Sequence, residues 1–146
     1  MFAEHTADPD HAAAPTPHSQ ETWPDEIPHP CETWPDNGRG FRETLDRIGD
    51  KWSVLVIGLL SQGPLRFGML HQRVPGISQR MLTLTLRHLE RDGIVSRTAY
   101  AEVPPRVEYE LTALGESLRA TVYALARWVT DHNDEIETAR HHYDTR

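Results

Sequence analysis

Arginine, glutamine and hydroxyl side chains cluster between positions 78 and 91 of the chain. An arginine can donate two hydrogen bonds to guanine, a glutamine can pair with adenine, and a threonine can reach a base edge, a thymine methyl group or a phosphate. Such groups read bases when they open a helix lying in the major groove, whereas cations further along contact phosphate. We therefore expect DNA contacts from Ser78, Gln79, Arg80, Thr83 and Arg87, with Arg91 as a further phosphate contact.

The same stretch carries the features that would seat this helix on a protein. Three leucines fall on one face at helical spacing, namely Leu82, Leu86 and Leu89. Ser78 is a favourable N-cap, and Gly93 stands where a left-handed residue ends a helix. A shorter helix is expected over 67–74, and Pro75-Gly76 breaks the chain between the two. This arrangement predicts a helix-turn-helix motif; the alternative is an ordinary amphipathic helix with a solvated polar face. For Arg87 and Arg91 the alternative to a phosphate contact is a salt bridge to Asp or Glu.

The flanking sequence predicts the remaining elements of one small domain. In order, we expect helices over 41–49 and 51–61, a short strand at 65–67, the two motif helices, strands over 94–100 and 106–111, and a helix from Thr112 to about His132. The helix over 51–61 is apolar on most sides, which predicts a central place in the core. Two prolines in AEVPP, between the long strands, predict a stiff hairpin tip. A hairpin directly after a recognition helix is a wing, so the pattern indicates a mainly α (α+β) winged helix-turn-helix fold with a two-stranded β-wing.

Three further arginines flank the motif. Arg97 and Arg106 lie in the two predicted wing strands and are candidates for backbone or minor-groove contact. Arg106 can instead pair across the hairpin with an acidic residue, and the sequence favours neither interpretation. Arg66 precedes the first motif helix, and we expect it to clamp a phosphate. His71 and His88 lie on the motif and are expected at the surface or facing DNA.

The net charge of -7 at first sight disfavours a nucleic-acid partner. Charge is unevenly spread, however. Residues 1–36 hold eight acidic and no basic residues, residues 37–106 hold eleven basic and six acidic ones, and residues 107–146 hold four basic and eight acidic ones. Phosphate attraction depends on regional charge, so the basic central segment is compatible with double-stranded DNA as the partner.

The last helix predicts a second partner, another protein chain. Its apolar stripe consists of Leu114, Leu118, Val122, Leu125 and Val129, with Trp128 beside it. This face is longer than a core of this size can cover, which indicates an interface.

Residues 1–36 form a separate region in composition. They hold seven of the eleven prolines and little aliphatic content, so we expect a disordered acidic Pro/His-rich extension before a domain over 37–146. The pentapeptide ETWPD occurs at 21–25 and again at 32–36. It is either a local duplication without function or a docking segment. The docking interpretation leads to an alternative function, in which the winged helix is a scaffold for protein interaction.

Several classes of protein are disfavoured. No nucleophile elbow, Walker loop, zinc-protease motif or dinucleotide fingerprint occurs, so we expect no enzyme, and neither a cofactor nor a metal site is predicted. The single cysteine, Cys31, excludes an intrachain disulfide and favours a reducing compartment. No apolar run is long enough for a membrane span or a signal peptide, so a cytoplasmic protein without membrane contact is expected.

The chain also resembles the HxlR-type transcriptional regulators, winged-helix proteins related to the MarR group. The matching segments are LDRIGDKWSVLVIGLL at 45–60, GPLRFGMLHQRVPGISQRMLTLTLRHLERDGIVSR at 63–97 and VPPRVEYELTALGESL at 103–118. They cover most of residues 41–132. The resemblance implies a bacterial regulator that binds a pseudo-palindromic operator as a homodimer, with N- and C-terminal helices forming the dimer. Such a protein lies on the nucleoid when bound, and a small-molecule or electrophile effector stays open.

Redox sensing is a property of some members of that family. Many carry a cysteine just before the first helix, a position occupied here by Arg39. Cys31 lies further upstream, next to Glu32, which would raise rather than lower the pKa of the thiol. Cys31 is a redox-sensor candidate, and we favour an incidental thiol.

Overall fold

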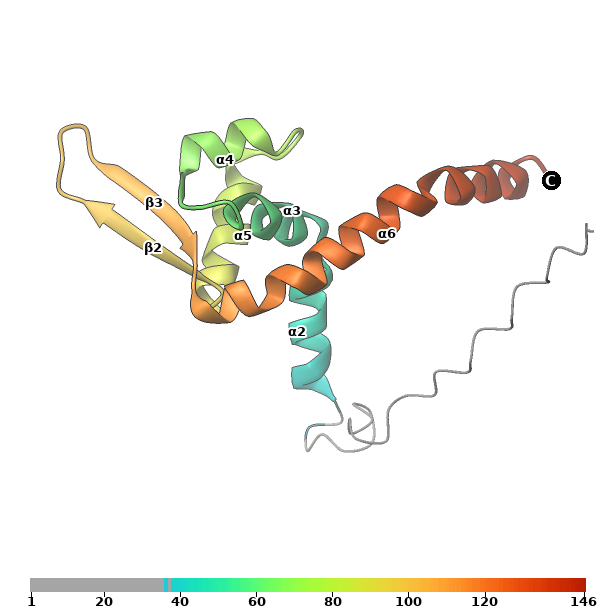
Figure 1. Ribbon diagram of the computed structural model, residues 1–146, viewed down its shortest axis with the longest axis horizontal. Coiled ribbons are helices and arrows are strands. Elements are labelled where there is room, and N and C mark those ends of the chain that lie inside the picture. The colour runs from blue at the N-terminus through green and yellow to red at the C-terminus, as the bar shows by residue number, and fades with distance from the viewer. Residues whose placement is uncertain (1–35, 37) are drawn as a thin grey trace, which may run out of the picture. The chain divides into compact units, whose positions relative to one another are not determined.

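The computed structural model describes residue 36 and residues 38–146, so the predictions for the extension, its repeat and Cys31 lie almost entirely outside the described residues. The chain divides between Phe41 and Arg42, and Arg42–Arg146 forms one unit. The elements follow the order α2 (Arg39–Gly49), α3 (Lys51–Leu60), β1 (Leu65–Arg66), α4 (Phe67–Arg73), α5 (Gln79–Arg91), β2 (Val95–Tyr100), β3 (Arg106–Leu111) and α6 (Ala113–Asp144), as Figure 1 shows. This is the predicted winged helix-turn-helix order.

Helix α3 lies at the centre of the core, as its apolar sequence predicts. Asp50 caps its first turn by accepting a hydrogen bond from the Ser53 backbone N–H at 3.1 Å. Val56, Ile57 and Leu60 are almost completely buried. The helix packs against α5 on one side and α6 on another. It therefore connects the helix-turn-helix motif to the last helix.

The helix-turn-helix motif forms where it was predicted. The Ser78 hydroxyl accepts a hydrogen bond from the Met81 backbone N–H at 3.0 Å and begins α5. Leu82, Leu86 and Leu89 are each at most 1% exposed. Gly93 adopts φ 75°, the left-handed conformation expected of the residue after the helix. The leucine face thus fixes which side of α5 is turned to solvent.

The wing consists of the antiparallel strands β2 and β3, and β1 pairs with the other edge of β3. Strand order is β1-β3-β2, and the predicted short strand at 65–67 thus supplies a third strand. In register, Leu65 lies opposite Tyr109, and Tyr100 lies opposite Arg106. Val95 and Leu111 are buried at the base of the hairpin, so the sheet is anchored in the core while its tip extends from the domain (Figure 1).

Helix α6 is longer than predicted. It continues to Asp144, so the predicted end near His132 is wrong. No glycine or proline follows Gly115, and the acidic and alanine-containing sequence after Asn133 remains compatible with a helix. The Tyr123 hydroxyl lies 2.5 Å from Ser61 Oγ, which ties α6 to the end of α3. This hydrogen bond, with a smaller contribution from Arg119, lowers the pKa of Tyr123 below its ordinary value.

Within the described residues, no helix combines the length and the apolar character needed to cross a membrane.

Candidate nucleic-acid interface

The outward face of α5 presents cations that are not neutralised by neighbours. Arg80, Arg87 and Arg91 are exposed, and in residues 38–146 none of them forms an ion pair. The salt bridges that were the alternative for Arg87 and Arg91 are therefore absent from the described part of the chain. Three guanidinium groups remain available on the face opposite the buried leucines.

The polar residues at the start of α5 accompany Arg80. Gln79 is exposed in the first turn, directly after the capping Ser78. The Thr83 hydroxyl donates to the Gln79 carbonyl oxygen at 2.8 Å, which leaves its oxygen lone pairs as acceptors. The first turn and the next one thus combine a guanidinium, an amide and a hydroxyl, the groups that recognise base edges.

The two arginines of the wing differ in their ion pairs. Arg106 pairs with Glu102 at 3.1 Å and with Glu108 at 3.3 Å, and its guanidinium lies 4.0 Å from the centre of the Tyr100 ring. Two carboxylates balance its charge, and its side chain is only 26% exposed. Of the two interpretations open for Arg106, pairing within the hairpin is the one that the structure contains.

Arg97 is the available cation of the wing. It lies opposite Tyr109 in the register of β2 and β3 and is exposed. It has no ion pair with any residue in the described part of the chain. Arg66 is likewise exposed, and it is the residue that precedes α4. Unlike these exposed arginines, both histidines of the motif are half-buried. His71 lies beside the Phe67 ring, and His88 lies on α5.

An ion pair between α2 and the end of α5 was not found by sequence reasoning. Arg47 Nε donates to an Asp92 carboxylate oxygen at 2.8 Å, and Asp92 is the C-cap of α5. A groove of about 700 Å³ lies beside this pair, lined by both helices and including His88 and Arg91. The two partners are far apart in the chain, so no local pattern could reveal them. Their contact fixes α2 against the helix that carries the candidate base-reading groups.

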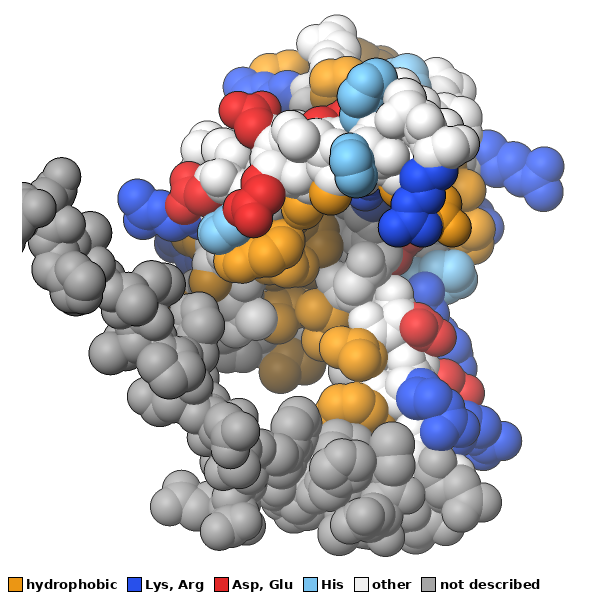
Figure 2. All heavy atoms as spheres, turned by 90° about the vertical axis from the view of Figure 1, so that its right-hand side faces the viewer, with side chains coloured by type: hydrophobic (Ala, Val, Ile, Leu, Met, Phe, Trp, Pro, Cys, Tyr) orange, Lys and Arg blue, Asp and Glu red, His pale blue; other side chains and the backbone are white. Residues whose placement is uncertain are grey.

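A second surface feature is apolar and faces solvent. Leu125 is 45% exposed, Trp128 is 52% exposed and Val129 is 47% exposed, all on α6, and Leu45 on α2 is 54% exposed. Figure 2 shows hydrophobic side chains gathered on the side of the domain from which α6 projects. Exposed apolar side chains of this size and number are typical of an interface.

Comparison with known proteins agrees with this architecture. The model of the HxlR-like helix-turn-helix family matches residues 47–137. The chain belongs to the HxlR family. An uncharacterised HTH-type transcriptional regulator from Methanothermobacter thermautotrophicus is 50% identical over 84 residues, which span 58% of this chain and 64% of that protein.

Solved structures of other regulators are similar to this chain. The transcriptional regulator ytfH from Salmonella typhimurium matches with a TM-score of 0.66 and 39% identity, covering 69% of this chain and 90% of that one. The reduced form of the redox regulator HypR matches with a TM-score of 0.63 and 42% identity, covering 68% of this chain and 98% of the other. The chain is therefore a transcriptional regulator of the HxlR type, and the resemblance found in the sequence is confirmed.

Proposed function

We propose that this HxlR-family regulator binds a pseudo-palindromic operator as a homodimer and acts in the bacterial cytoplasm as a non-enzymatic DNA-binding protein. The observation that carries the proposal is the exposed face of α5, where a guanidinium, an amide and a hydroxyl open the helix and no carboxylate neutralises the arginines. Arg97 on β2 and Arg66 before α4 extend the cationic surface on either side. The exposed apolar face of α2 and α6 supplies the dimer interface in this proposal.

The roles of the α5 side chains follow from their positions along the helix. Arg80, Gln79 and Thr83 occupy the end at which a recognition helix meets base edges. Arg87 lies two turns further along and is assigned to phosphate. Arg91 lies in the last turn beside the groove shared with α2, so it binds phosphate if it touches DNA at all.

Replacement of Arg80 and of Arg91 by alanine should separate these roles. Arg80→Ala is expected to cost about 1–3 kcal/mol on the best site and to relax selection at one base position, because a bidentate contact to guanine is lost. Arg91→Ala should weaken binding to all sequences alike and reduce the dependence on salt concentration. Fluorescence anisotropy with matched and single-base-changed duplexes at several salt concentrations measures both. A uniform loss of affinity in both variants would contradict the assignment.

The operator itself tests the dimeric arrangement. DNA fragments that the full-length protein selects from a random pool should share an inverted repeat. Its half-sites should lie one helical turn, about 34–36 Å, or a multiple of it, apart. A selected consensus without dyad symmetry would count against two-fold binding.

The alternative proposal is a protein-interaction module that uses the winged helix as a scaffold and the ETWPD repeat as a docking segment. The acidic composition of residues 1–36 favours it, and the unpaired arginines of α5 favour DNA. Retardation of duplex DNA that weakens as salt rises would support the DNA proposal. No retardation at low salt would support the interaction module.

We propose further that Cys31 does not control DNA binding, although HypR is a redox regulator. Cys31→Ser should bind the operator like the parent protein, both before and after treatment with diamide. The same is expected after deletion of residues 1–36, because α3, α5, α6 and the wing pack on one another within the unit Arg42–Arg146. Loss of operator binding in diamide by the parent, with retention by Cys31→Ser, would make Cys31 the sensor.

A further inference from the structure

Helix α6 carries a heptad repeat that continues past the domain. Hydrophobic side chains recur at alternating spacings of three and four, with one histidine among them. In heptad notation the a positions are Val122, Val129, Ile136 and Tyr143, and the d positions are Leu118, Leu125, His132 and Ala139. From the repeat and its exposure we infer that the half of α6 over 125–143 pairs with the same helix of a second copy as a parallel, two-stranded coiled coil. The inference rests on the proposed homodimer and deepens it.

The first part of this stripe already has a partner within the chain. Val122 is only 3% exposed, and Leu118 packs against the core. Beyond this point Leu125 is 45% exposed, Val129 is 47% exposed and Tyr143 is 68% exposed, whereas His132 and Ile136 are half-buried. One face of α6 thus belongs to the core on its first turns and is partly exposed on its later turns.

The later turns of α6 form their polar and ring contacts within the helix in the part of the chain that the structure describes. Among the described residues, every hydrogen bond, ring contact and ion pair of those after Ala126 lies within the helix or its last turn. At 1.5 Å per residue, this segment projects roughly 25–30 Å. Isolated helices of such length are marginal in water, and most helical stability comes from packing an apolar face. The segment therefore requires a partner, and its repeat is self-complementary.

The residue types at the seam favour two parallel strands. Val129 and Ile136 are β-branched and occupy a positions, while Leu125 occupies a d position. This combination favours parallel dimers over larger bundles. The flanking charges agree, because Glu135 at g and Arg140 at the following e position can pair between the two helices. In the single chain Arg140 has only an exposed contact of 3.6 Å with Glu137, which is weak and easily exchanged.

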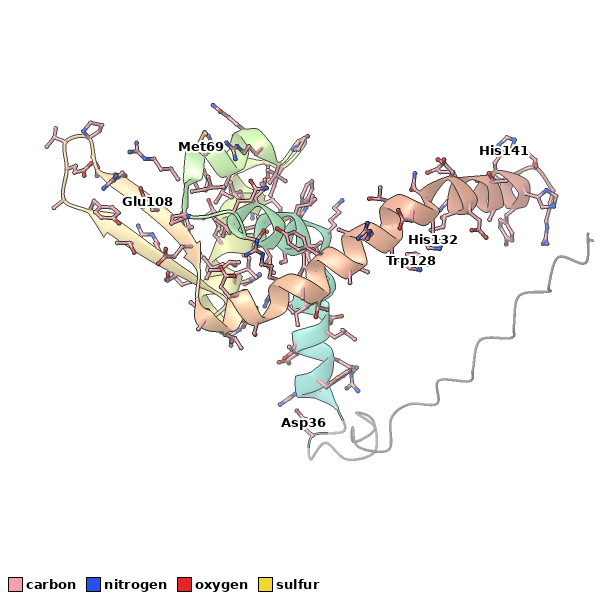
Figure 3. The ribbon with its side chains drawn as sticks, viewed as in Figure 1. Asp36, Met69, Glu108, Trp128, His132 and His141 are labelled. Carbon is pink, nitrogen blue, oxygen red and sulfur yellow. The ribbon has the colours of Figure 1, made fainter. Side chains whose placement is uncertain are left out.

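His132 fixes the register in which the two α6 helices pair. It occupies a d position, where it would meet its own counterpart across the seam. Its ring stacks on Trp128 with centroids 4.5 Å apart, and its Nδ1 lies 2.8 Å from the Trp128 carbonyl oxygen. Figure 3 shows Trp128 and His132 on the same side of α6, with His141 on the opposite side. A polar layer at this place lowers the stability of the coiled coil and disfavours shifted pairings.

The arrangement leaves the DNA-reading surface free. In Figure 1 the wing and the later turns of α6 extend from opposite sides of the domain. A two-fold axis along a parallel coiled coil places the two wings and the two α5 helices at the same end of the dimer. An operator with dyad symmetry can then be met by both copies at once.

Disulfide trapping tests the seam and its direction. In the full chain with Cys31→Ser, Ala139→Cys places thiols at facing d positions, whose Cα atoms in a parallel pair are close enough for a disulfide. Mild oxidation should convert most of this variant to a covalent dimer. The control is His141→Cys, at the outward f position, which should stay monomeric on a denaturing gel. Equal cross-linking of both, or of neither, would overturn the inference.

A second pair of variants measures stability without cysteine. Ile136→Asp should raise the dimer dissociation constant roughly tenfold or more, because two apolar side chains leave the seam. Thr138→Asp, at the outward c position, should change it little, and His132→Leu should lower it. Sedimentation of the full chain gives all three values. If Ile136→Asp leaves a dimer of parental strength, the coiled coil is refuted while the homodimer stands; if the parent is itself a monomer, the proposed homodimer has failed.

Discussion

Replacement of both Leu125 and Trp128 by glutamate is expected to give monomers that bind operator DNA poorly. The two side chains are about half exposed on α6 and belong to the apolar face assigned to the dimer. Four carboxylates in a dimer of this variant would be desolvated without partners, which a surface of this kind cannot offset. A monomer contacts one half-site only, so operator affinity should fall by roughly 10²–10⁴-fold through lost bivalency.

Light scattering at several concentrations, with anisotropy on the selected operator, measures this effect. Arg127→Glu is the matched control, because it changes the charge of α6 by the same amount from an exposed position on the other side of the helix. The control should remain dimeric and lose little operator affinity. A dimer that persists in the double variant would place the interface elsewhere on the protein.

Local sequence patterns were sufficient to predict the helix-turn-helix motif and the wing. Each depends on residues close together in the chain, such as Ser78 as the cap of α5 and the leucines spaced along it. The alternating strand 106–111 was predicted for the same reason. Burial of Leu82, Leu86 and Leu89 follows from periodicity alone, because the face that they share has to be covered.

Contacts between distant residues could not be predicted in this way. The pair Arg47–Asp92 joins α2 to the C-cap of α5, and neither residue carries a local signal of the other. The two ion pairs of Arg106, in contrast, are local, because Glu108 lies two residues further along the same strand and Glu102 lies four residues earlier, in the tip. Sequence left two interpretations for this arginine, and only the geometry of the hairpin distinguishes them.

The end of α6 was missed for a different reason. An Asn-Asp pair after His132 favours a turn, whereas the helix continues because no residue there breaks it and the heptad stripe goes on to Tyr143. The apolar period is the stronger indicator of a helix over such a length. The seven-residue repeat of apolar side chains over 118–143 would have predicted the observed C-terminal end of α6.

Gly115→Ala is expected to destabilise the domain strongly, whereas Gly58→Ala should not. A Cβ at Gly115 would overlap the Ile94 carbonyl oxygen and lie 3.1 Å from the Leu111 side chain. The Ile94 oxygen cannot easily withdraw, because it accepts hydrogen bonds from the Thr112 backbone N–H at 3.0 Å and the Thr112 hydroxyl at 3.2 Å. These contacts join the end of the wing to the N-cap of α6.

Overpacking of this kind typically costs about 1–3 kcal/mol, and the backbone position of the clash predicts the upper end or more. At Gly58, inside α3, a Cβ meets nothing within 4 Å. Alanine there should be neutral or stabilise the helix by up to about 1 kcal/mol through its higher helical propensity. Urea unfolding followed by circular dichroism should therefore show a lowered midpoint for Gly115→Ala and an unchanged or raised midpoint for Gly58→Ala. Equal shifts would mean that α6 can move away from Ile94 at little cost, and that the wing and the last helix are less rigidly joined than their hydrogen bonds indicate.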